Sequence, residues 1–294
     1  MDNVTSTLAN YYKLLRPHQY VKNTFVLLPI FFAQHLTDIP ALLHTMGVFV
    51  CFCLVASSIY IINDYRDMKE DRQHPTKKMR PLAAGLIPSH QALLLSFFLM
   101  STGFYGAWMI RPEVMGVLSG YWLLNLVYSL GLKHIALLDI MTIATGFVLR
   151  IFAGGFAAQV KISMWIILLT FLLALFLAVA KRREDVLLLA SGIQKTRKSI
   201  DGYNLEFINA TMVLMSAVIV VAYIFYTISL EIRQNFHSDY LYLTVVFVLL
   251  GILRYMQITF VENKSGDPTR ILLNDRFLQG TLIAWLGSFM FLIY

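Results

Sequence analysis

The chain has 294 residues, of which 58% are hydrophobic and 14% are charged, and its formal net charge is +7. A soluble domain carries charge on roughly a quarter of its residues, so this composition excludes most soluble folds. The basic excess suits loops beside a membrane, and no recognisable nucleic-acid-binding module accompanies it, so we expect no nucleic-acid partner.

Long apolar runs predict the fold. A helix of about 20 apolar residues crosses the roughly 30 Å hydrocarbon core of a bilayer. Such runs lie near 20–36, 41–62, 91–110, 114–131, 135–156, 163–180, 208–229, 240–257 and 277–294. Pro29 interrupts the first run, which is short, so eight spans is the alternative. We expect an all-α integral membrane protein with nine transmembrane helices, in a single transmembrane domain over residues 1–294.

The basic residues outside these runs gather on one side of the predicted membrane. The N-terminal segment and the loops after each even-numbered run carry most Lys and Arg side chains, whereas the other side carries Arg111, Lys161 and Arg233. Cytoplasmic loops are enriched in basic residues, so we expect the basic side to face the cytoplasm across the plasma (inner) membrane. The cytoplasmic loops of interest lie near 63–90 and 181–207.

An acidic motif, NDYRDMKED, follows the second apolar run. Asp64, Asp67 and Asp71 are three and four residues apart, so on a continuing helix they share one face, where their charges repel. Hard oxygen ligands of this kind suit Mg²⁺, which binds protein carboxylates together with substrate phosphates. The alternative is a solvated helix end of mixed charge.

This motif resembles the first aspartate-rich motif of the UbiA superfamily of intramembrane prenyltransferases. The resemblance implies a UbiA-like bundle of nine transmembrane helices with an active-site cavity that faces the cytoplasm. It also implies that Mg²⁺ and the pyrophosphate of the donor bind at Asn63, Asp64, Asp67 and Asp71, with Asp64 and Asp67 as catalytic residues.

Stretches spread over most of the chain resemble one branch of this superfamily, the decaprenyl-phosphate phosphoribosyltransferases. They are RPHQYVKN (16–23), HPTKKMRPLAAG (74–85), YSLGLKH (128–134), GFVLRIFAGG (146–155), AKRREDV (180–186) and GDPTRILLNDRFLQ (266–279). This resemblance implies Mg²⁺-dependent transfer of 5-phosphoribose from phosphoribosyl pyrophosphate to a polyprenyl phosphate lipid. A homo-oligomer is compatible with it.

Two other functions stay open. A UbiA-type prenyltransferase would move a prenyl group to an aromatic acceptor, and it usually carries a second motif, of DxxxD type, after the sixth span. This chain has KRREDVLLLASG there, where Glu184 and Asp185 are adjacent and point about 100° apart on a helix. A transporter without enzymatic activity would place its charges near the bilayer midplane, whereas here they gather in predicted loops.

Basic side chains are the candidates for substrate phosphates. Lys77 and Arg80 follow a His74-Pro75 turn that would fold the chain back, and an arginine binds two phosphate oxygens at once. Lys22 is a candidate for the acceptor phosphate or, alternatively, an anchor at the membrane interface. The full set, with a purely topological role as the alternative, is Lys22, Lys77, Arg80, Lys133, Lys181 and Arg182.

Two acids complete the predicted site, and one arginine has no assigned role. Asp139 lies within the fifth run, and an intramembrane acid usually faces a cavity or a charged partner. Asp185 is the candidate for a catalytic second metal ligand or for a partner of ribose hydroxyls. Arg150 lies roughly 20–25 Å along the helix from Lys133, and the sequence assigns it no function.

Overall fold

The computed structural model of the chain describes residues 2–73, 77–191 and 198–294. Every regular element in these ranges is a helix, which confirms the all-α prediction. The chain splits into two compact units: unit 1 comprises residues 1–131 and 149–162, and unit 2 comprises residues 132–148 and 163–294. One transmembrane domain over residues 1–294 stays a prediction.

In the described part of the chain, seven helices are long and apolar enough to cross a membrane. They are α3 (Ile39–Arg66), α5 (Ser89–Ile110), α7 (Leu138–Ala158), α8 (Met164–Ala190), α9 (Leu205–Ile228), the segment Leu241–Phe260 and α13 (Arg276–Ile293). Each overlaps a predicted run. α8 continues well past its predicted end near 180, so residues 181–190, expected in a loop, belong to this helix.

The two remaining predicted spans take other forms. The run near 20–36 is a 3-10 helix, η1 (Pro17–Leu27), followed by the short helix α2 (Leu28–Phe32). The run near 114–131 is α6 (Pro112–Leu130), whose polar side chains Glu113 and Asn125 lower its hydropathy. Since neither segment is among the seven helices, the count of nine spans stays a prediction.

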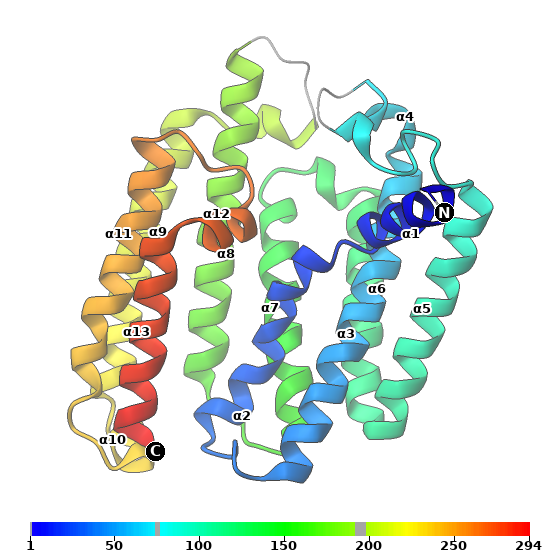
Figure 1. Ribbon diagram of the computed structural model, residues 1–294. Helices are drawn as coiled ribbons and strands as arrows, with labels where there is room; N and C mark the ends of the chain where they lie inside the picture. Colours follow the sequence, from blue (N-terminus) through cyan, green and yellow to red (C-terminus); the bar gives the residue numbers. More distant parts are fainter. Residues whose placement is uncertain (1, 74–76, 192–197) are drawn as a thin grey trace. The chain divides into compact units, whose positions relative to one another are not determined.

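Helix α3 is the centre of unit 1. Asp38 caps its start by accepting a hydrogen bond from the Ala41 N–H at 3.1 Å. The helix packs most extensively against α5, and also against η1 and α6 (Figure 1). Phe52, Val55 and Ile59 are buried in the resulting core. The other elements of this unit are α1 (Asp2–Leu15), α4 (Met68–Asp71) and η2 (Lys77–Met79).

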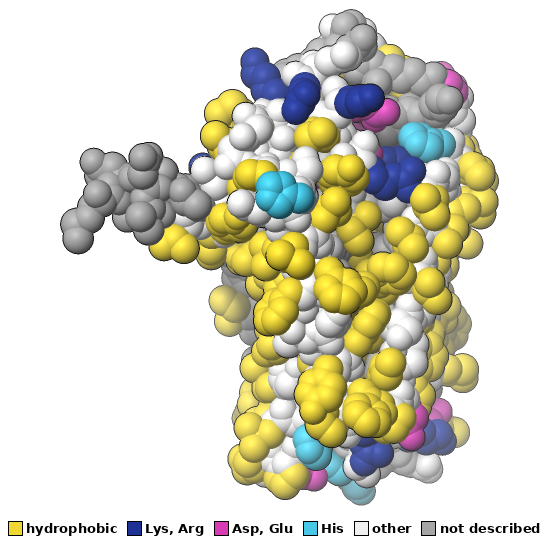
Figure 2. All heavy atoms as spheres, turned by 90° about the vertical axis from the view of Figure 1, so that its right-hand side faces the viewer, with side chains coloured by type: hydrophobic (Ala, Val, Ile, Leu, Met, Phe, Trp, Pro, Cys, Tyr) yellow, Lys and Arg dark blue, Asp and Glu magenta, His cyan; other side chains and the backbone are white. Residues whose placement is uncertain are grey.

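Helix α5 presents bulky apolar side chains at the surface of unit 1. Leu94 is 70% exposed, Phe98 65% and Tyr105 62%. Figure 2 shows, on the face of this unit that carries α5, hydrophobic side chains across the middle and Lys and Arg side chains toward the ends. An exposed apolar band of this kind is suited to contact with lipid rather than water. Together with the long apolar helices, it identifies an integral membrane protein.

The second half of α7 packs against η1 inside unit 1. A Cβ atom at Gly154 would lie 1.9 Å from the carbonyl oxygen of Val26, so this close approach of two backbones requires glycine. The same stretch places Arg150 in the interior, where its Nε donates to Asn23 Oδ1 and its Nη2 to Tyr121 OH, both at 2.9 Å. Arg150 therefore links α7 to η1 and α6, a packing role that the sequence did not reveal.

Unit 2 is built from two adjacent helix pairs, α8 with α9 and α11 (Val245–Phe260) with α13 (Figure 1). Side-chain caps begin its helices: Ser163 for α8, Asn204 for α9 and Asp275 for α13. Phe176 and Tyr255 are buried in its core. Its other elements are η3 (Leu132–His134), η4 (Lys198–Gly202), α10 (Leu230–Phe236), η5 (Leu241–Thr244) and α12 (Pro268–Asn274).

Candidate functional site

In unit 1 the acidic motif meets two arginines at the end of α3. Asp64 is 2% exposed, and its Oδ1 accepts hydrogen bonds from Arg16 Nη2 at 2.5 Å and from Arg80 Nη1 at 3.1 Å. Arg80 Nη1 also donates to Asp71 Oδ2 at 2.6 Å. One guanidinium nitrogen therefore bridges two buried carboxylates. We call Arg16, Asp64, Asp71 and Arg80 the aspartate–arginine cluster.

Local backbone structure brings the two aspartates together. Helix α3 ends at Arg66, and Asp67 serves as its C-cap and as the start of α4. The Asp71 N–H donates to the Asp67 carbonyl at 2.8 Å, which completes one further helical turn. Asp64, Asp67 and Asp71 thus lie on a nearly continuous helical path, as the sequence predicts.

The two arginines reach the aspartates from different segments. Arg16 lies between α1 and η1 with a left-handed backbone (φ 55°), just before Pro17, and its guanidinium stacks over the Tyr60 ring at 5.4 Å. Arg80 follows η2, and its N–H donates to the Lys77 carbonyl at 2.9 Å. Arg80, which follows η2, therefore lies beside the end of α3. The predicted turn itself, at His74-Pro75, lies outside the described residues.

The cluster has the donor atoms that a hard divalent cation requires. A cationic group, Arg80 Nη1, already lies between Asp64 and Asp71. Asp64 Oδ2 is buried and has no hydrogen-bond partner among the described residues. The oxygen donors fit Mg²⁺, which is normally held by one or two carboxylates and by substrate phosphates. Within the described ranges no three His, Cys, Asp or Glu side chains lie close enough to hold an ion, so substrate would have to supply ligands.

The other predicted residues of unit 1 lie near the cluster in sequence. Asn63 Oδ1 accepts a hydrogen bond from the Ser129 hydroxyl, which ties the end of α3 to α6. Asp67 is half-buried at the C-cap of α3, and Lys77 is half-buried in η2. Lys22 is half-buried in η1. The structure thus joins Asp64, Asp71 and Arg80 directly and leaves the roles of these four residues as predictions.

A second charged cluster lies inside unit 2. Arg182 on α8 is 1% exposed, and its Nε lies 2.6 Å from Asp139 Oδ2, on α7. Its Nη1 donates to Asp185 Oδ2, also at 2.6 Å. The Tyr203 hydroxyl donates to Asp139 Oδ1 at 2.6 Å. We call Asp139, Arg182, Asp185 and Tyr203 the Arg182 cluster.

Tyr203 fastens the segment before α9 to the start of α7. Its hydroxyl accepts a hydrogen bond from the Leu137 N–H at 2.7 Å, where Leu137 has a left-handed backbone with φ 68°. A Cβ atom at Gly202 would lie 2.4 Å from Ala136 Cβ, so glycine permits this close contact. Burial, and then the hydrogen bond to Asp139, raise the pKa of the Tyr203 hydroxyl. The hydroxyl therefore keeps its proton and remains a donor.

The remaining predicted residues of unit 2 are Lys133 in η3 and Lys181 on α8, both half-buried. Sequence reasoning missed Arg16 and Tyr203 as members of the two clusters, and Ser129 as the partner of Asn63. Arg16 stands in the quoted stretch RPHQYVKN, and the resemblance of that stretch to the family is the signal that could have found it. Ser129 stands in another quoted stretch, YSLGLKH, whereas Tyr203 stands in none of them and its partner Asp139 is far away in sequence.

Comparison with known proteins shows the family and the fold. A model of the UbiA prenyltransferase family matches residues 24–278. Proteins named decaprenyl-phosphate phosphoribosyltransferase are 34% identical in Mycolicibacterium smegmatis and 31% in Mycobacterium tuberculosis, over 96% of this chain and 92% and 93% of theirs. A UbiA homolog from Archaeoglobus fulgidus, solved with DMAPP and Mg²⁺, has a TM-score of 0.71 at 20% identity, covering 96% of this chain and 99% of that one.

The family model spans most of the chain, and the relatives match it nearly from end to end. The solved homolog supports the helical fold. The resemblance expected from the motif NDYRDMKED is thereby confirmed, and the chain belongs to the UbiA prenyltransferase family.

Proposed function

We propose that the chain transfers 5-phosphoribose from phosphoribosyl pyrophosphate to a polyprenyl phosphate of decaprenyl type and releases pyrophosphate. The observation that carries the proposal is the aspartate–arginine cluster, which combines buried carboxylates with two guanidinium groups. The activity named for the relatives at 34% and 31% identity selects the donor and the acceptor.

The charges of the cluster suit a pyrophosphate group. The side chains of Arg16 and Arg80 are 21% and 27% exposed, so an incoming anion can reach them, whereas Asp64 is buried beneath them. A guanidinium group binds phosphate oxygens in pairs and keeps its charge at any physiological pH. We infer that Arg80 gives up part of its contact with the carboxylates when the donor binds, and that Lys77 binds the same phosphates.

Mg²⁺ would be held by Asp64 and Asp71, with Asn63 and Asp67 as further proposed ligands. When bound, it neutralises negative charge on the leaving pyrophosphate. The same carboxylates would otherwise repel the donor. Arg16 and Arg80 aim fixed positive charge at oxygens whose negative charge grows in the transition state, which is the usual source of the largest catalytic effect.

The proposed reaction exchanges one bond at C1 of the ribose. A phosphate oxygen of the lipid acceptor forms the new bond to C1, and the bond between C1 and the pyrophosphate oxygen breaks with its electron pair. The ring oxygen of the ribose stabilises the positive charge that develops at C1. Lys22 is the proposed partner of the acceptor phosphate.

We propose different roles for the predicted residues of unit 2. Lys133 and Lys181 are half-buried cations that we propose as phosphate ligands. The charge of Arg182 is already matched by two carboxylates, so we propose that it holds Asp139 and Asp185 in place. Asp185, with a side chain 17% exposed, is the member of this cluster best placed to meet a substrate hydroxyl.

We also propose that α6 and the η1–α2 segment complete nine spans, and that the basic loops and the active site face the cytoplasm in the plasma membrane. A cysteine at Ser191 should then react with an impermeant reagent only from the cytoplasmic side. Cysteines at Ser163 and Ser238 should react only from outside. Labelling of the Ser191 variant from outside intact cells would reverse this orientation.

A transfer assay tests the function. Purified protein is incubated with Mg²⁺, decaprenyl phosphate and phosphoribosyl pyrophosphate labelled in the ribose. We expect the label to appear in a lipid-linked phosphoribose, with pyrophosphate released in equal amount. Geranyl diphosphate with an aromatic acid is the parallel arm. Product in that arm alone would identify an aromatic prenyltransferase, the function of other members of this fold.

A further inference from the structure

Unit 2 has a second arginine, next to Arg182, whose surroundings differ from those of the Arg182 cluster. Arg183 is 7% exposed, and its Nε donates to Asn209 Oδ1 at 3.1 Å. Its Nη1 donates to the Thr259 carbonyl at 2.7 Å and to Asn263 Oδ1 at 3.1 Å. All three acceptors are uncharged. No carboxylate of the described residues forms an ion pair with Arg183.

A buried cation without a counter-ion is costly, because burial removes it from water. The Thr259 carbonyl lies at the C-terminal end of α11, where the helix dipole supplies about half a negative charge. The Phe260 ring, 5.3 Å from the guanidinium carbon, adds a weak attraction. These contacts offset part of the charge of Arg183. An anion from outside the chain would balance the rest of this charge.

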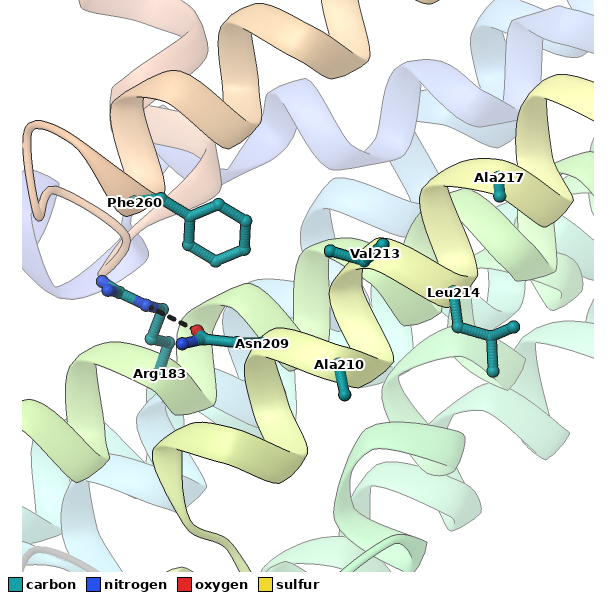
Figure 3. A pocket seen from close by; sticks show the side chains of 7 residues that line it. All are labelled: Arg183, Asn209, Ala210, Val213, Leu214, Ala217 and Phe260. Carbon is teal, nitrogen blue, oxygen red and sulfur yellow. Dashed lines mark hydrogen bonds between the residues drawn. The ribbon is translucent and has the colours of Figure 1, made fainter.

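Arg183 stands at one end of an apolar groove on unit 2 (Figure 3). The groove has a volume of about 790 Å³ and lies between α9 and the end of α11. Phe260 of α11 lies across from four residues of α9: Ala210, Val213, Leu214 and Ala217. These four share one face of α9 and extend over about 10 Å of helix. Val213 is 53% exposed and Leu214 59%, so the groove opens to the surface.

We propose that this groove binds an anionic phospholipid of the surrounding membrane, with its phosphate at Arg183 and an acyl chain along α9. The apolar lining suits a hydrocarbon chain, and the cation at its end suits a phosphate. An arginine placed this way distinguishes an anionic headgroup from a zwitterionic one by charge.

The position of Arg183 separates this lipid from the Arg182 cluster. Adjacent residues of a helix point about 100° apart. Arg182 points to Asp139 on α7, whereas Arg183 points to α9 and α11. A phosphate bound at Arg183 is therefore turned away from the Arg182 cluster, where Asp185 is the proposed partner of a substrate hydroxyl.

The test measures lipid binding to delipidated protein in detergent, by thermal midpoint and by native mass spectrometry. The probes are phosphatidylglycerol, phosphatidylcholine with the same acyl chains, and decaprenyl phosphate. We expect phosphatidylglycerol to raise the midpoint and to stay bound in the gas phase, and phosphatidylcholine to do neither. Arg183→Gln should weaken phosphatidylglycerol about tenfold or more, because a charge-assisted contact is lost.

Two variants complete the design. Ala217→Phe fills the groove from an exposed position without touching Arg183, and it should weaken phosphatidylglycerol in a protein that folds normally. Arg233→Gln removes an exposed arginine paired with Asp239, and it should leave lipid binding unchanged. The proposal is overturned if Arg183→Gln or Ala217→Phe binds phosphatidylglycerol as tightly as the original chain does. It is equally overturned if decaprenyl phosphate, and not phosphatidylglycerol, binds in a manner that depends on Arg183.

Discussion

The aspartate–arginine cluster of unit 1 and the Arg182 cluster of unit 2 use the same chemistry with opposite accessibility. In the first, the arginine side chains are 21% and 27% exposed and cover two buried acids. In the second, Arg182 is 1% exposed, and Asp139 beside it is fully buried. Both have aspartates that share a guanidinium group.

This difference in burial distinguishes a cluster suited to bind an anion from a cluster suited to hold helices in position. An exposed arginine loses little when it exchanges a carboxylate for a phosphate, because water screens both states. A buried ion pair cannot open without leaving a charge unpaired in an apolar interior. We therefore propose that the first cluster binds anions and that the second supports α7, α8 and the segment before α9.

The largest expected effect is on stability, in unit 2. Arg182→Met leaves Asp139 buried and without its cation, which should lower the free energy of unfolding by about 3–5 kcal/mol. Chemical denaturation in detergent measures it. Arg80→Met should cost less than Arg182→Met, because water reaches the Arg80 side chain, which is 27% exposed, and Asp64 keeps its contact with Arg16. Adding Asp139→Asn to Arg182→Met should recover more than half of the loss. Equal costs for the two arginine variants would remove the distinction between the clusters.

The next effect is on catalysis, in unit 1. Asp64→Asn removes a charge that we propose to hold Mg²⁺ and that binds Arg16 and Arg80. The transfer rate should fall by roughly 10² to 10³, equivalent to about 3–4 kcal/mol, with little change in the thermal midpoint. Glu113→Gln, at the exposed start of α6, is the matched control and should be fully active. Full activity of Asp64→Asn, or of the unaltered chain in EDTA, would contradict the metal assignment.

The sequence predicts a contact of the two clusters only where the residues in contact lie close together along the chain. Asp64 and Asp71 lie close together along the chain, so their spacing predicts a shared site, and Arg80 follows Asp71 by only nine residues. Arg16 reaches Asp64 from another segment, and no local pattern encodes that contact. The same holds for Tyr203 and Asp139.

Helix boundaries show the same limit. The charged residues KRRED predict the end of a span, yet α8 continues to Ala190. Arg182 and Arg183 have partners on neighbouring helices, and these contacts let the charges stay on a helix instead of in a loop. The run near 20–36 suggests one continuous span, and it forms a 3-10 helix followed by a short α-helix whose second residue is Pro29.

The smallest expected effect concerns the hydroxyl of Tyr203. Tyr203→Phe removes a donor to Asp139 and an acceptor for the Leu137 N–H, which should cost about 1–3 kcal/mol. Tyr105→Phe, at a side chain 62% exposed, is the control and should cost nothing measurable. The raised pKa of Tyr203 means that its contribution is fully present below pH of about 10 and is lost as the pH rises further. If Tyr203→Phe does not lower the free energy of unfolding at pH 7, this hydroxyl does not support the Arg182 cluster.

Calorimetric titration of phosphoribosyl pyrophosphate into the purified protein, without any lipid, tests the central claim most directly. The account predicts binding in Mg²⁺, at least tenfold weaker binding in EDTA or with Arg80→Ala, and much weaker binding of geranyl diphosphate at the same concentration. Tight binding of geranyl diphosphate together with no binding of phosphoribosyl pyrophosphate would contradict it.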